Sequence, residues 1–582
     1  MLGKFDIARA LREISQLMTL KGETPFKARA YENASRAVEQ LTEERLHELV
    51  DQKKLTELDG IGDSLAAKIT ELRLTDRSTY LEELRASLPA GFVELSRVPG
   101  LGPKKVQLLT RDLGIHSLVE LEAACVAGRL GQVKGFGEKT QANLLEGVRQ
   151  LRSHSERILL VEAAAQGEPL VAWLRASPAV VRAELAGSFR RWRETVADLD
   201  VVVATDDGEA VMDRFAAYPE VGAVESRGET KCTVRLKSGL QVDLRVLPPA
   251  DFWTALHHFT GSKEHHVRLR GIARGLGLQI SEWGLHRLDS NGAPTAEKLL
   301  VDSEEALYRH LGLQAMPPEL RENQGEIELA ERHAIPTDLL DEGDVRGFVH
   351  CHTNFSDGKN TVEEMARAAD ALGIEYLTIT DHSPTASYAG GVDARRLRTQ
   401  WDELARVQQL VKVRLLRGCE SDILEDGALD YPDDILEKLD VVIASVHNRH
   451  GMDEERMTQR LLHCMRLPVF KIWGHPLGRL LNKREPFACR VEEILDALAA
   501  SRGVVELNGD PHRLDLEPQW IRAARERGLK FVVSCDAHST AALAYTRFGV
   551  HLARRGGVRK GEVLNTLPVE KFLEAVRPVA AH

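Results

Sequence analysis

The sequence predicts a multidomain α/β protein in which a helical, a mixed and a barrel-like part follow one another. The first 150 residues read as helices interrupted by Gly-x-Gly turns, and residues 157–312 read as short strands mixed with helices. From residue 346 onward, apolar strand-like runs alternate with helical stretches, which is typical of a parallel α/β domain. At about 150 residues per domain, a chain of 582 residues is long enough for roughly four domains.

The composition is that of an ordinary soluble protein. Hydrophobic residues make up 43% of the chain and charged residues 28%, which excludes disorder as the main state. No apolar run approaches the ~18 residues of a membrane span, and the N-terminus reads as an amphipathic helix and not as a signal peptide. The seven cysteines form no CxxC pair, so we expect reduced thiols, a cytoplasmic location and no membrane partner.

Three segments repeat one pattern, an apolar run followed by Gly-x-Gly and a helical stretch: residues 55–69, 95–109 and 130–145. The glycines permit a tight turn, and the helix that follows offers free N–H groups to an anion. The pattern resembles the helix-hairpin-helix motif, which in many proteins holds nucleic-acid phosphates without reading sequence. The DNA-binding residues we expect from it are Gly60, Gly62, Gly100, Gly102, Lys104, Lys105, Gly135, Gly137 and Lys139.

Charge supports this interpretation only locally. The formal net charge of -11 argues against a nucleic-acid partner, because phosphate binding favours basic surfaces. Residues 96–152, however, hold nine Lys or Arg against five acids. A Gly-x-Gly turn between packed helices, or a solvated helical face, is the alternative for each segment taken alone. Three such segments in one basic region favour contact with the DNA backbone.

Three aspartates form the first candidate catalytic site. In a strand the period of two places Asp198 and Asp200 on one face, and Asp243 on an adjacent strand can face the same side. Three acids in close quarters require a cation to stay charged. Two divalent ions would serve, one activating a 3′-hydroxyl and one holding a triphosphate. A surface pair is the alternative for an isolated Asp-x-Asp, but the third aspartate favours metal binding.

Upstream of the aspartates, the segment AGSFRRWRE supplies groups suited to phosphate. Gly187 and Ser188 can offer backbone N–H groups and a hydroxyl, and Arg190 and Arg191 can add charge-assisted hydrogen bonds.

GSFRR, DLD and VDLR, followed by HFTGSKEHHVRLR (258–270), together resemble the palm and thumb of a family X DNA polymerase, the group of DNA polymerase beta. The resemblance implies that Asp198, Asp200 and Asp243 bind Mg²⁺ or Mn²⁺. It also implies dNTPs and gapped or nicked DNA as partners. The residues it assigns to the incoming nucleotide are Gly187, Ser188, Arg191, Arg157, Phe259, Thr260, Gly261, Ser262 and, toward the template, Arg270.

The chain departs from the family pattern at three positions. His258 stands where Tyr is usual beside the incoming sugar, His266 stands where Asn is usual, and Trp192 replaces a usual Gly. These departures leave sugar discrimination, fidelity and closure on the triphosphate open. The family's lyase lysine corresponds to Lys68, which if desolvated could attack the aldehyde of an abasic 5′ end, although a solvated helix lysine is the alternative. Lys27 and Arg29, near Tyr31, are candidate contacts to a 5′-phosphate.

A second candidate site follows from seven strand-like runs in the C-terminal part. Six of the seven end in a His or an acid, and parallel barrels place their chemistry at the C-terminal ends of strands. A lone His at a strand end is commonly a satisfied core residue, but six strand ends in register favour a metal centre. Nitrogen and carboxylate ligands without sulfur fit Zn²⁺, Mn²⁺ or Fe, and such ions suit water activation for attack on a phosphoester. By the same alternation, we expect Cys351, Cys419 and Cys535 to point toward the helices.

HCHTNFSDG, TDHS, GCE, SVH, GHP and CDAH resemble the PHP (polymerase and histidinol phosphatase) domain. Its distorted (β/α)7 barrel holds up to three ions, and Asp381, Asn508 and Asp510 are expected beside them. The order of the parts matches bacterial family X polymerases, whose PHP domain is a Mn²⁺-dependent 3′→5′ exonuclease that in some members cuts at abasic sites. The ligands it implies are His350, His352, Asp357, His382, Glu420, His447, His475, Asp536 and His538.

We therefore expect a monomeric, nucleoid-associated polymerase that fills short gaps in base excision repair and trims 3′ ends. A PHP nuclease with a weakened polymerase core and a non-catalytic DNA-end scaffold are the alternatives. The expected domains are a helical lyase-like domain (1–85), hairpin fingers (86–152), a nucleotidyltransferase palm (153–250), a thumb (251–318), a linker (319–345) and a PHP domain (346–582).

Overall fold

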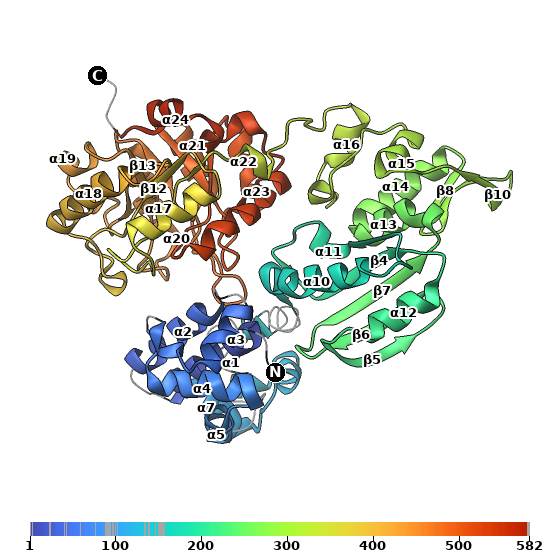
Figure 1. The fold of residues 1–582 in the computed structure, drawn as a ribbon, viewed down its shortest axis with the longest axis horizontal. Coiled ribbons are helices and arrows are strands. Elements are labelled where there is room, and N and C mark those ends of the chain that lie inside the picture. Colours follow the sequence, from blue (N-terminus) through green and yellow to red (C-terminus); the bar gives the residue numbers. More distant parts are fainter. Residues whose placement is uncertain are drawn as a thin grey trace. The chain divides into compact units, whose positions relative to one another are not determined.

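The computed structural model divides the chain into two compact units, Met1–Arg157 and Ile158–His582 (Figure 1). The residues that the structure describes are 2, 4–21, 25–39, 41, 43–58, 60–75, 77–87, 95, 98, 101, 103–132, 136–137, 140–141, 143–145, 147–148 and 157–578.

The first unit is helical, as the sequence predicts. One apolar core joins helices of residues 4–86, with Ile7, Leu49 and Ile69 buried in it. A second core joins the later helices around Val106 and Leu121. The helices are α1 (Lys4–Lys21), α2 (Pro25–Glu39), α3 (Glu43–Asp51), α4 (Asp63–Thr75), α5 (Thr79–Ala86), α7 (Pro103–Leu113) and α8 (Leu118–Val126).

The second unit begins with a five-stranded sheet in the order β2-β4-β7-β6-β5. Strands β4 and β7 are parallel, and the other neighbours are antiparallel. Val201 and Val203 pack in one core, while Val202 on the opposite face packs against Phe252. The elements are α10 (Leu160–Arg175), β2 (Arg182–Leu185), α11 (Gly187–Arg190), β4 (Asp198–Ala204), α12 (Gly208–Ala216), β5 (Val221–Arg227), β6 (Lys231–Leu236), β7 (Gln241–Leu247) and α13 (Phe252–Thr260), with the short pair β1 (Ile158–Leu159) and β3 (Thr195–Val196).

A smaller α+β part follows, with a three-stranded antiparallel sheet. Its strands are β8 (Leu278–Ser281), β9 (Gly284–Leu288) and β10 (Pro294–Leu299), and its helices are α14 (Lys263–Gly275) and α15 (Glu304–His310). The segment expected as a linker, 319–345, contains helix α16 (Glu326–Glu331), and its Ile327 and Ile335 are buried with Tyr308 in the same core.

The C-terminal part is a seven-stranded parallel barrel with the strands in sequence order, which confirms the predicted fold class. A parallel bridge between Cys351 and Ala537 joins the first strand to the last and brings the sheet close to closure. The strands are β11 (Gly347–Phe348), β12 (Tyr376–Ile379), β13 (Arg414–Asp422), β14 (Val441–Ser445), β15 (Lys471–Trp473), β16 (Gly503–Asn508) and β17 (Phe531–Ser534).

Helices surround this barrel (Figure 1). They are α17 (Val362–Ala371), α18 (Ala394–Gln408), α19 (Asp433–Leu436), α20 (Glu454–Arg466), α21 (Val491–Ala499), α22 (Pro518–Glu526), α23 (Thr546–Arg555) and α24 (Val569–Val576). Phe572 and Val576 of α24 pack with Val349, Ile443 and other apolar strand residues in one core. That core takes residues from the early part of each strand, which leaves the C-terminal strand ends to the polar side chains.

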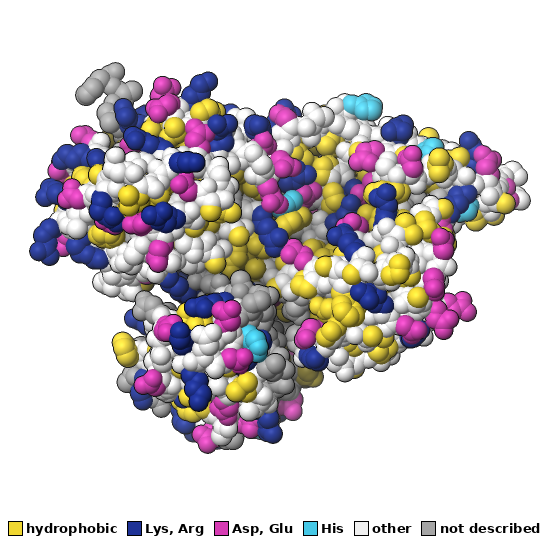
Figure 2. All heavy atoms as spheres, viewed as in Figure 1, with side chains coloured by type: hydrophobic (Ala, Val, Ile, Leu, Met, Phe, Trp, Pro, Cys, Tyr) yellow, Lys and Arg dark blue, Asp and Glu magenta, His cyan; other side chains and the backbone are white. Residues whose placement is uncertain are grey.

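Charge is mixed over the visible surface. On the face shown in Figure 2, basic and acidic side chains are interspersed across the barrel. No helix among the residues that the structure describes is long and apolar enough to cross a bilayer.

Candidate active sites

The barrel brings all nine predicted ligands together at the C-terminal ends of its strands. Three groups have ligand atoms within 4.8 Å of one another. They are His352 with Asp357, His382 and His538; His350 with His352 and Asp536; and His382 with Glu420 and His447. His475, the remaining residue, places Nε2 2.9 Å from Oε1 of Glu420.

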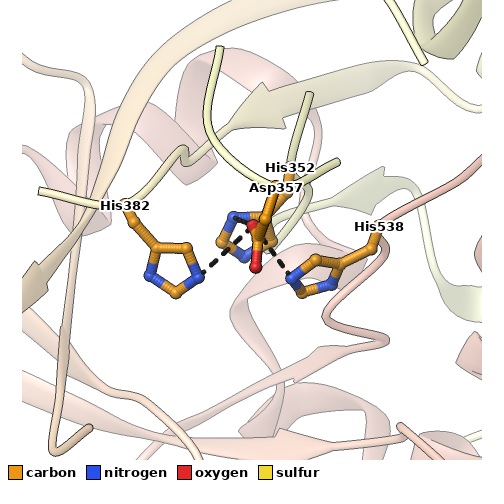
Figure 3. Close-up of side chains that lie close together, drawn as sticks. All are labelled: His352, Asp357, His382 and His538. Atoms are coloured by element: carbon orange, nitrogen blue, oxygen red, sulfur yellow. Dashed lines mark ion pairs between the residues drawn. The ribbon is translucent and has the colours of Figure 1, made fainter. Parts of the chain in front are cut away.

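Asp357 lies between three histidines from different segments (Figure 3). Its Oδ1 is 3.3 Å from Nε2 of His538, 3.6 Å from Nε2 of His382 and 3.9 Å from Nδ1 of His352. Three nitrogens and one carboxylate at these separations suit a single divalent transition metal.

Glu420 is the centre of the cluster. One carboxylate oxygen faces His447 at 3.1 Å, and the other faces Nδ1 of His382 at 3.0 Å and Nε2 of His350 at 3.4 Å. Because its two oxygens face different sets of histidines, Glu420 would help to hold more than one ion.

The donor set fits metal ions better than it fits a set of hydrogen bonds. Buried polar atoms are normally hydrogen-bonded. Within the described part of the chain, however, buried ligand atoms without a hydrogen-bond partner concentrate here: Nε2 of His350, both ring nitrogens of His352, Nδ1 of His382, Oε2 of Glu420 and Oδ1 of Asp536. A group of cations would satisfy these atoms together.

The pKa values of two histidines in the cluster are shifted in opposite directions. Burial alone would lower the pKa of His447, but the carboxylates of Glu420 and Asp422 raise that pKa to about 10. Burial, followed by the neighbouring His538 and His382, lowers the pKa of His352 to about 3. A neutral imidazole is the form that ligates metal.

Two acids that the sequence argument did not assign orient the ligands. Nδ1 of His350 lies 2.6 Å from Oε1 of Glu506, and Nδ1 of His447 lies 2.6 Å from Oδ1 of Asp422. Such carboxylate partners set the tautomer of a ligating histidine. The signal was present in the sequence, because Glu506 and Asp422 lie on the strand-like runs that carry the other polar residues.

The three residues expected beside the ions have different surroundings. Asp381 accepts hydrogen bonds from Thr353 and Ser356 and so shapes the loop that carries Asp357. Asn508 donates to Glu506 at 3.1 Å, and Asp510 lies 2.9 Å from the ring of His512. Cys351, Cys419 and Cys535 are buried among apolar side chains, as expected.

In the five-stranded sheet, Asp200 and Asp243 are register partners on the parallel strands β4 and β7. Burial, together with the charges of Asp198 and Asp243, raises the pKa of Asp200 to about 7. This proximity of like charges favours a cation. The three aspartates do not form one of the close sets found among the described residues, and Nζ of Lys231 lies 3.1 Å from Oδ2 of Asp243.

Gly187 is packed against this site. It has φ +62°, and a Cβ there would lie 2.2 Å from Oδ2 of Asp200. Ser188 lies next to it at the start of the short helix α11.

The predicted phosphate-binding arginines have carboxylate partners. Arg191 pairs with Glu322 at 2.9 Å and donates to the carbonyl of Thr260, and Arg190 pairs with Glu304 at 2.7 Å. Gly261 lies directly beside Arg191, because a Cβ at Gly261 would be 3.1 Å from Nη1 of that arginine. A triphosphate that bound Arg191 would therefore have to compete with Glu322.

The remaining residues predicted at the nucleotide site lie on several elements. Ser262 is the N-cap of helix α14, and Arg270 is exposed on the same helix. The ring of Phe259 lies 5.0 Å from the guanidinium of Arg245, and Arg157 directly precedes β1. His258 and His266 have ring centroids 4.7 Å apart, and burial, together with His258, lowers the pKa of His266 to about 3.

Trp192, the third departure from the family pattern, contacts the barrel. Its ring stacks on His551 of α23 at 3.5 Å and 5°, and it meets Phe548 edge-on at 5.8 Å. Two residues on, Glu194 pairs with Arg555 at 2.7 Å and Arg479 at 3.6 Å. The tryptophan thus belongs to the contact between sheet and barrel.

In the helical unit, Gly60 has φ +76°, and Gly62 accepts backbone hydrogen bonds from the start of α4. Gly137 accepts from the amide of Gln141, and Lys105 lies 5.9 Å from the centroid of the Phe136 ring. The predicted Gly100, Gly102, Gly135 and Lys139 lie outside the described residues, and of Lys104 only the backbone, in α7, is described.

The candidate lyase residue lies on helix α4. Lys68 of α4 is partly exposed, donates to Oγ of Ser64 at 3.0 Å and lies 4.8 Å from the Tyr80 ring. Tyr80 stacks on Tyr31, and the nearby Lys27 and Arg29 of α2 are exposed.

Family models match four parts of the chain. A helix-hairpin-helix domain matches residues 3–78, a SAM-like helix-hairpin-helix tandem 92–150, the DNA polymerase beta thumb 255–322 and the PHP domain 349–510.

Curated relatives cover either the whole chain or its barrel. A "Probable phosphatase" of Thermoanaerobacter sp. (strain X514) is 29% identical over 229 residues, 37% of this chain and 89% of that protein. A similar protein of Caldanaerobacter subterraneus is 31% identical over 201 residues, 32% of this chain and 74% of that protein. The "DNA polymerase/3′-5′ exonuclease PolX" of Bacillus subtilis (strain 168) is 35% identical over 577 residues, 98% of this chain and 99% of that protein. The chain therefore belongs to the PolX family, the bacterial family X DNA polymerases that carry a C-terminal PHP domain.

Proposed function

We propose that the chain is a DNA-directed DNA polymerase that fills short gaps in base excision repair and removes nucleotides from 3′ ends. The observation that carries the proposal is the convergence of nine ligands in a barrel joined in one chain to an Asp200–Asp243 pair. Its substrates are dNTPs and gapped or nicked DNA, and it acts as a monomer in the cytoplasm at the nucleoid.

At the barrel, the nine ligands would hold up to three ions of Mn²⁺, Zn²⁺ or Fe, which supply an activated water for attack on a phosphodiester. The protein's own part is to orient the ligands. Glu506 and Asp422 hold His350 and His447 through their Nδ1 atoms, so that Nε2 of each faces the cluster.

At the sheet, Asp198, Asp200 and Asp243 would hold Mg²⁺ or Mn²⁺, which supplies charge neutralisation for nucleotidyl transfer. Gly187 leaves space for the Asp200 carboxylate. Arg191 contributes a positive charge for the triphosphate once Glu322 is displaced. Lys68 is partly exposed and donates to Oγ of Ser64, which favours a solvated helix lysine over a lyase nucleophile.

The test uses a primer that borders a short gap, with Mn²⁺ or Mg²⁺ and dNTPs. We expect Asp200→Ala to abolish extension and keep 3′ degradation, and His352→Ala to do the reverse. Full extension by Asp200→Ala would refute the assignment of polymerase chemistry to the aspartates. Little extension by the wild type, with strong 3′ degradation, would favour a nuclease with a weakened polymerase core. Degradation that survives in His352→Ala would refute the barrel as the nuclease. Absence of both extension and degradation in the wild type would leave only a DNA-end scaffold.

A further inference from the structure

Tyr388 is an exposed aromatic side chain beside the barrel's metal-ligand cluster. It is 56% exposed, and among the aromatic side chains that the structure describes only Phe26, at 84%, is more exposed. Its ring centroid lies 6.0 Å from the His382 ring and 6.1 Å from the His447 ring. These two histidines, with Glu420, form one of the three candidate ion sites.

The loop that carries Tyr388 is held by hydrogen bonds from Arg396 and by buried neighbouring residues, so the exposed position of the ring is part of the fold. Arg396 donates to the carbonyls of Gly390 and Gly391 at 2.8 and 3.2 Å, and it also donates to the carbonyl of Phe355. Ala386 and Ala389, on either side of the tyrosine, are buried at 0% and 4% exposure. The loop therefore presents one large side chain to solvent while its neighbours are packed.

The loop is also anchored to the strands that carry the ligands. The amide of Val392 donates to the carbonyl of His382 at 2.8 Å, and Oγ1 of Thr385 donates to Asp422 at 3.0 Å. Asp422 is the residue that holds His447. These hydrogen bonds hold the loop on both sides of Tyr388 against the segments that carry His382 and Asp422.

Arg513 lies 3.5 Å from Asp536 of the cluster, so a phosphate held there would have this arginine near it. The carboxylates of Glu420, Asp422 and Asp357 are the stronger electrostatic neighbours of Tyr388, and bound ions would offset their charge. The base of a nucleotide lies one sugar away from its phosphate, and the Tyr388 ring lies 6.0 and 6.1 Å from two of the ligand rings, so a phosphate held at the cluster would bring its base within reach of the tyrosine.

We propose that Tyr388 is the platform on which the base of the 3′-terminal nucleotide stacks while its phosphodiester occupies the barrel centre. The inference rests on the proposed exonuclease function of that centre and adds what selects a DNA end over a small phosphoester. Stacking needs the ring and not the hydroxyl, and it is tolerant of sequence because every base has a π face.

The test measures kcat/KM of the full-length protein with Mn²⁺ on two single-stranded DNAs. One ends in an ordinary 3′ nucleotide, and the other ends in a 3′-terminal abasic analogue that has the sugar and phosphate without a base. Bis(4-nitrophenyl) phosphate serves as a small diester. Tyr388→Ala should lose about 5-fold to 100-fold on the ordinary end, the range that base stacking on an aromatic side chain supports.

Removing the ring and removing the base should have the same effect, because they delete the two halves of one contact. We therefore expect Tyr388→Ala to equal wild type on the abasic end and on the small diester, and Tyr388→Phe to equal wild type on every substrate. Leu410→Ala, which alters a side chain 47% exposed just after helix α18, is the matched surface control and should change nothing.

An equal loss by Tyr388→Ala on the ordinary and abasic ends would overturn the stacking role. A loss by Tyr388→Phe as large as that of Tyr388→Ala would assign the function to the hydroxyl and would also overturn it. Failure of the underlying function has a different signature, since His352→Ala would then retain hydrolysis of both DNA and diester.

Discussion

Replacing Gly187 with alanine tests how tightly the backbone of α11 holds the aspartate site. A Cβ at Gly187 would lie 2.2 Å from Oδ2 of Asp200, whereas real contacts of a Cβ do not fall below 3.0 Å. The Asp200 carboxylate therefore has to move by about 1 Å, a displacement that costs on the order of 10²-fold in rate at an active site. The left-handed backbone adds a stability cost of roughly 1–2 kcal/mol for a non-glycine residue.

Gly239 provides the control for the backbone cost, because it has φ +91° and a Cβ added there would have nothing within 4 Å. Both alanine variants should lose roughly 1–2 kcal/mol of unfolding free energy in urea titrations. Only Gly187→Ala should lose about 100-fold in primer extension on gapped DNA, and both should degrade 3′ ends at the wild-type rate. Equal extension by the two variants would refute the role given to Gly187.

Three further predictions concern the barrel and its contact with the sheet. Burial opposes the charge of Glu194, but Arg555 and Arg479 lower its pKa from 4.5 to about 2, so its contribution to stability is present above pH 4.5 and is lost as pH falls toward about 2. Glu194→Gln should lower the free energy of unfolding by about 3 kcal/mol at pH 7 in urea titrations. Glu168→Gln, which breaks the exposed pair with Arg547, should lower it by less than about 1 kcal/mol. Equal losses in the two variants would contradict the buried pairing. Glu506→Gln should lower 3′ degradation about 10-fold to 100-fold by releasing His350, with extension unchanged as the internal control. Chelation of metal should lower the melting temperature measured by calorimetry, because the buried carboxylates and imidazoles lose their common partner, and adding Mn²⁺ should restore it. An unchanged melting curve would count against resident ions.

The contact between sheet and barrel explains the tryptophan at a position where the family usually has glycine. Trp192 has φ 54°, a conformation that glycine adopts without strain. Its stacking on His551 provides the compensating contact. Because His551 also lies 2.9 Å from Glu319 and 3.1 Å from Glu342, the same imidazole joins three segments of the second unit.

The sequence by itself determined the barrel and the identity of its candidate ligands. Strand periodicity is local, and in a parallel barrel every strand ends at the same rim, so histidines at the ends of separate runs have to converge. The same reasoning placed Asp198 and Asp200 on one face and paired them with the strand of Asp243.

Tertiary structure alone decided which partners those residues have. Glu420 faces five histidines, Arg191 is paired with Glu322 from 131 positions away, and Tyr388 is presented beside His382 and His447. These contacts join segments that are distant along the chain, and neither a period of two nor a short motif carries information about such distances. A repeating pattern specifies the direction in which a side chain points, whereas the neighbour it meets depends on how the whole barrel and sheet pack.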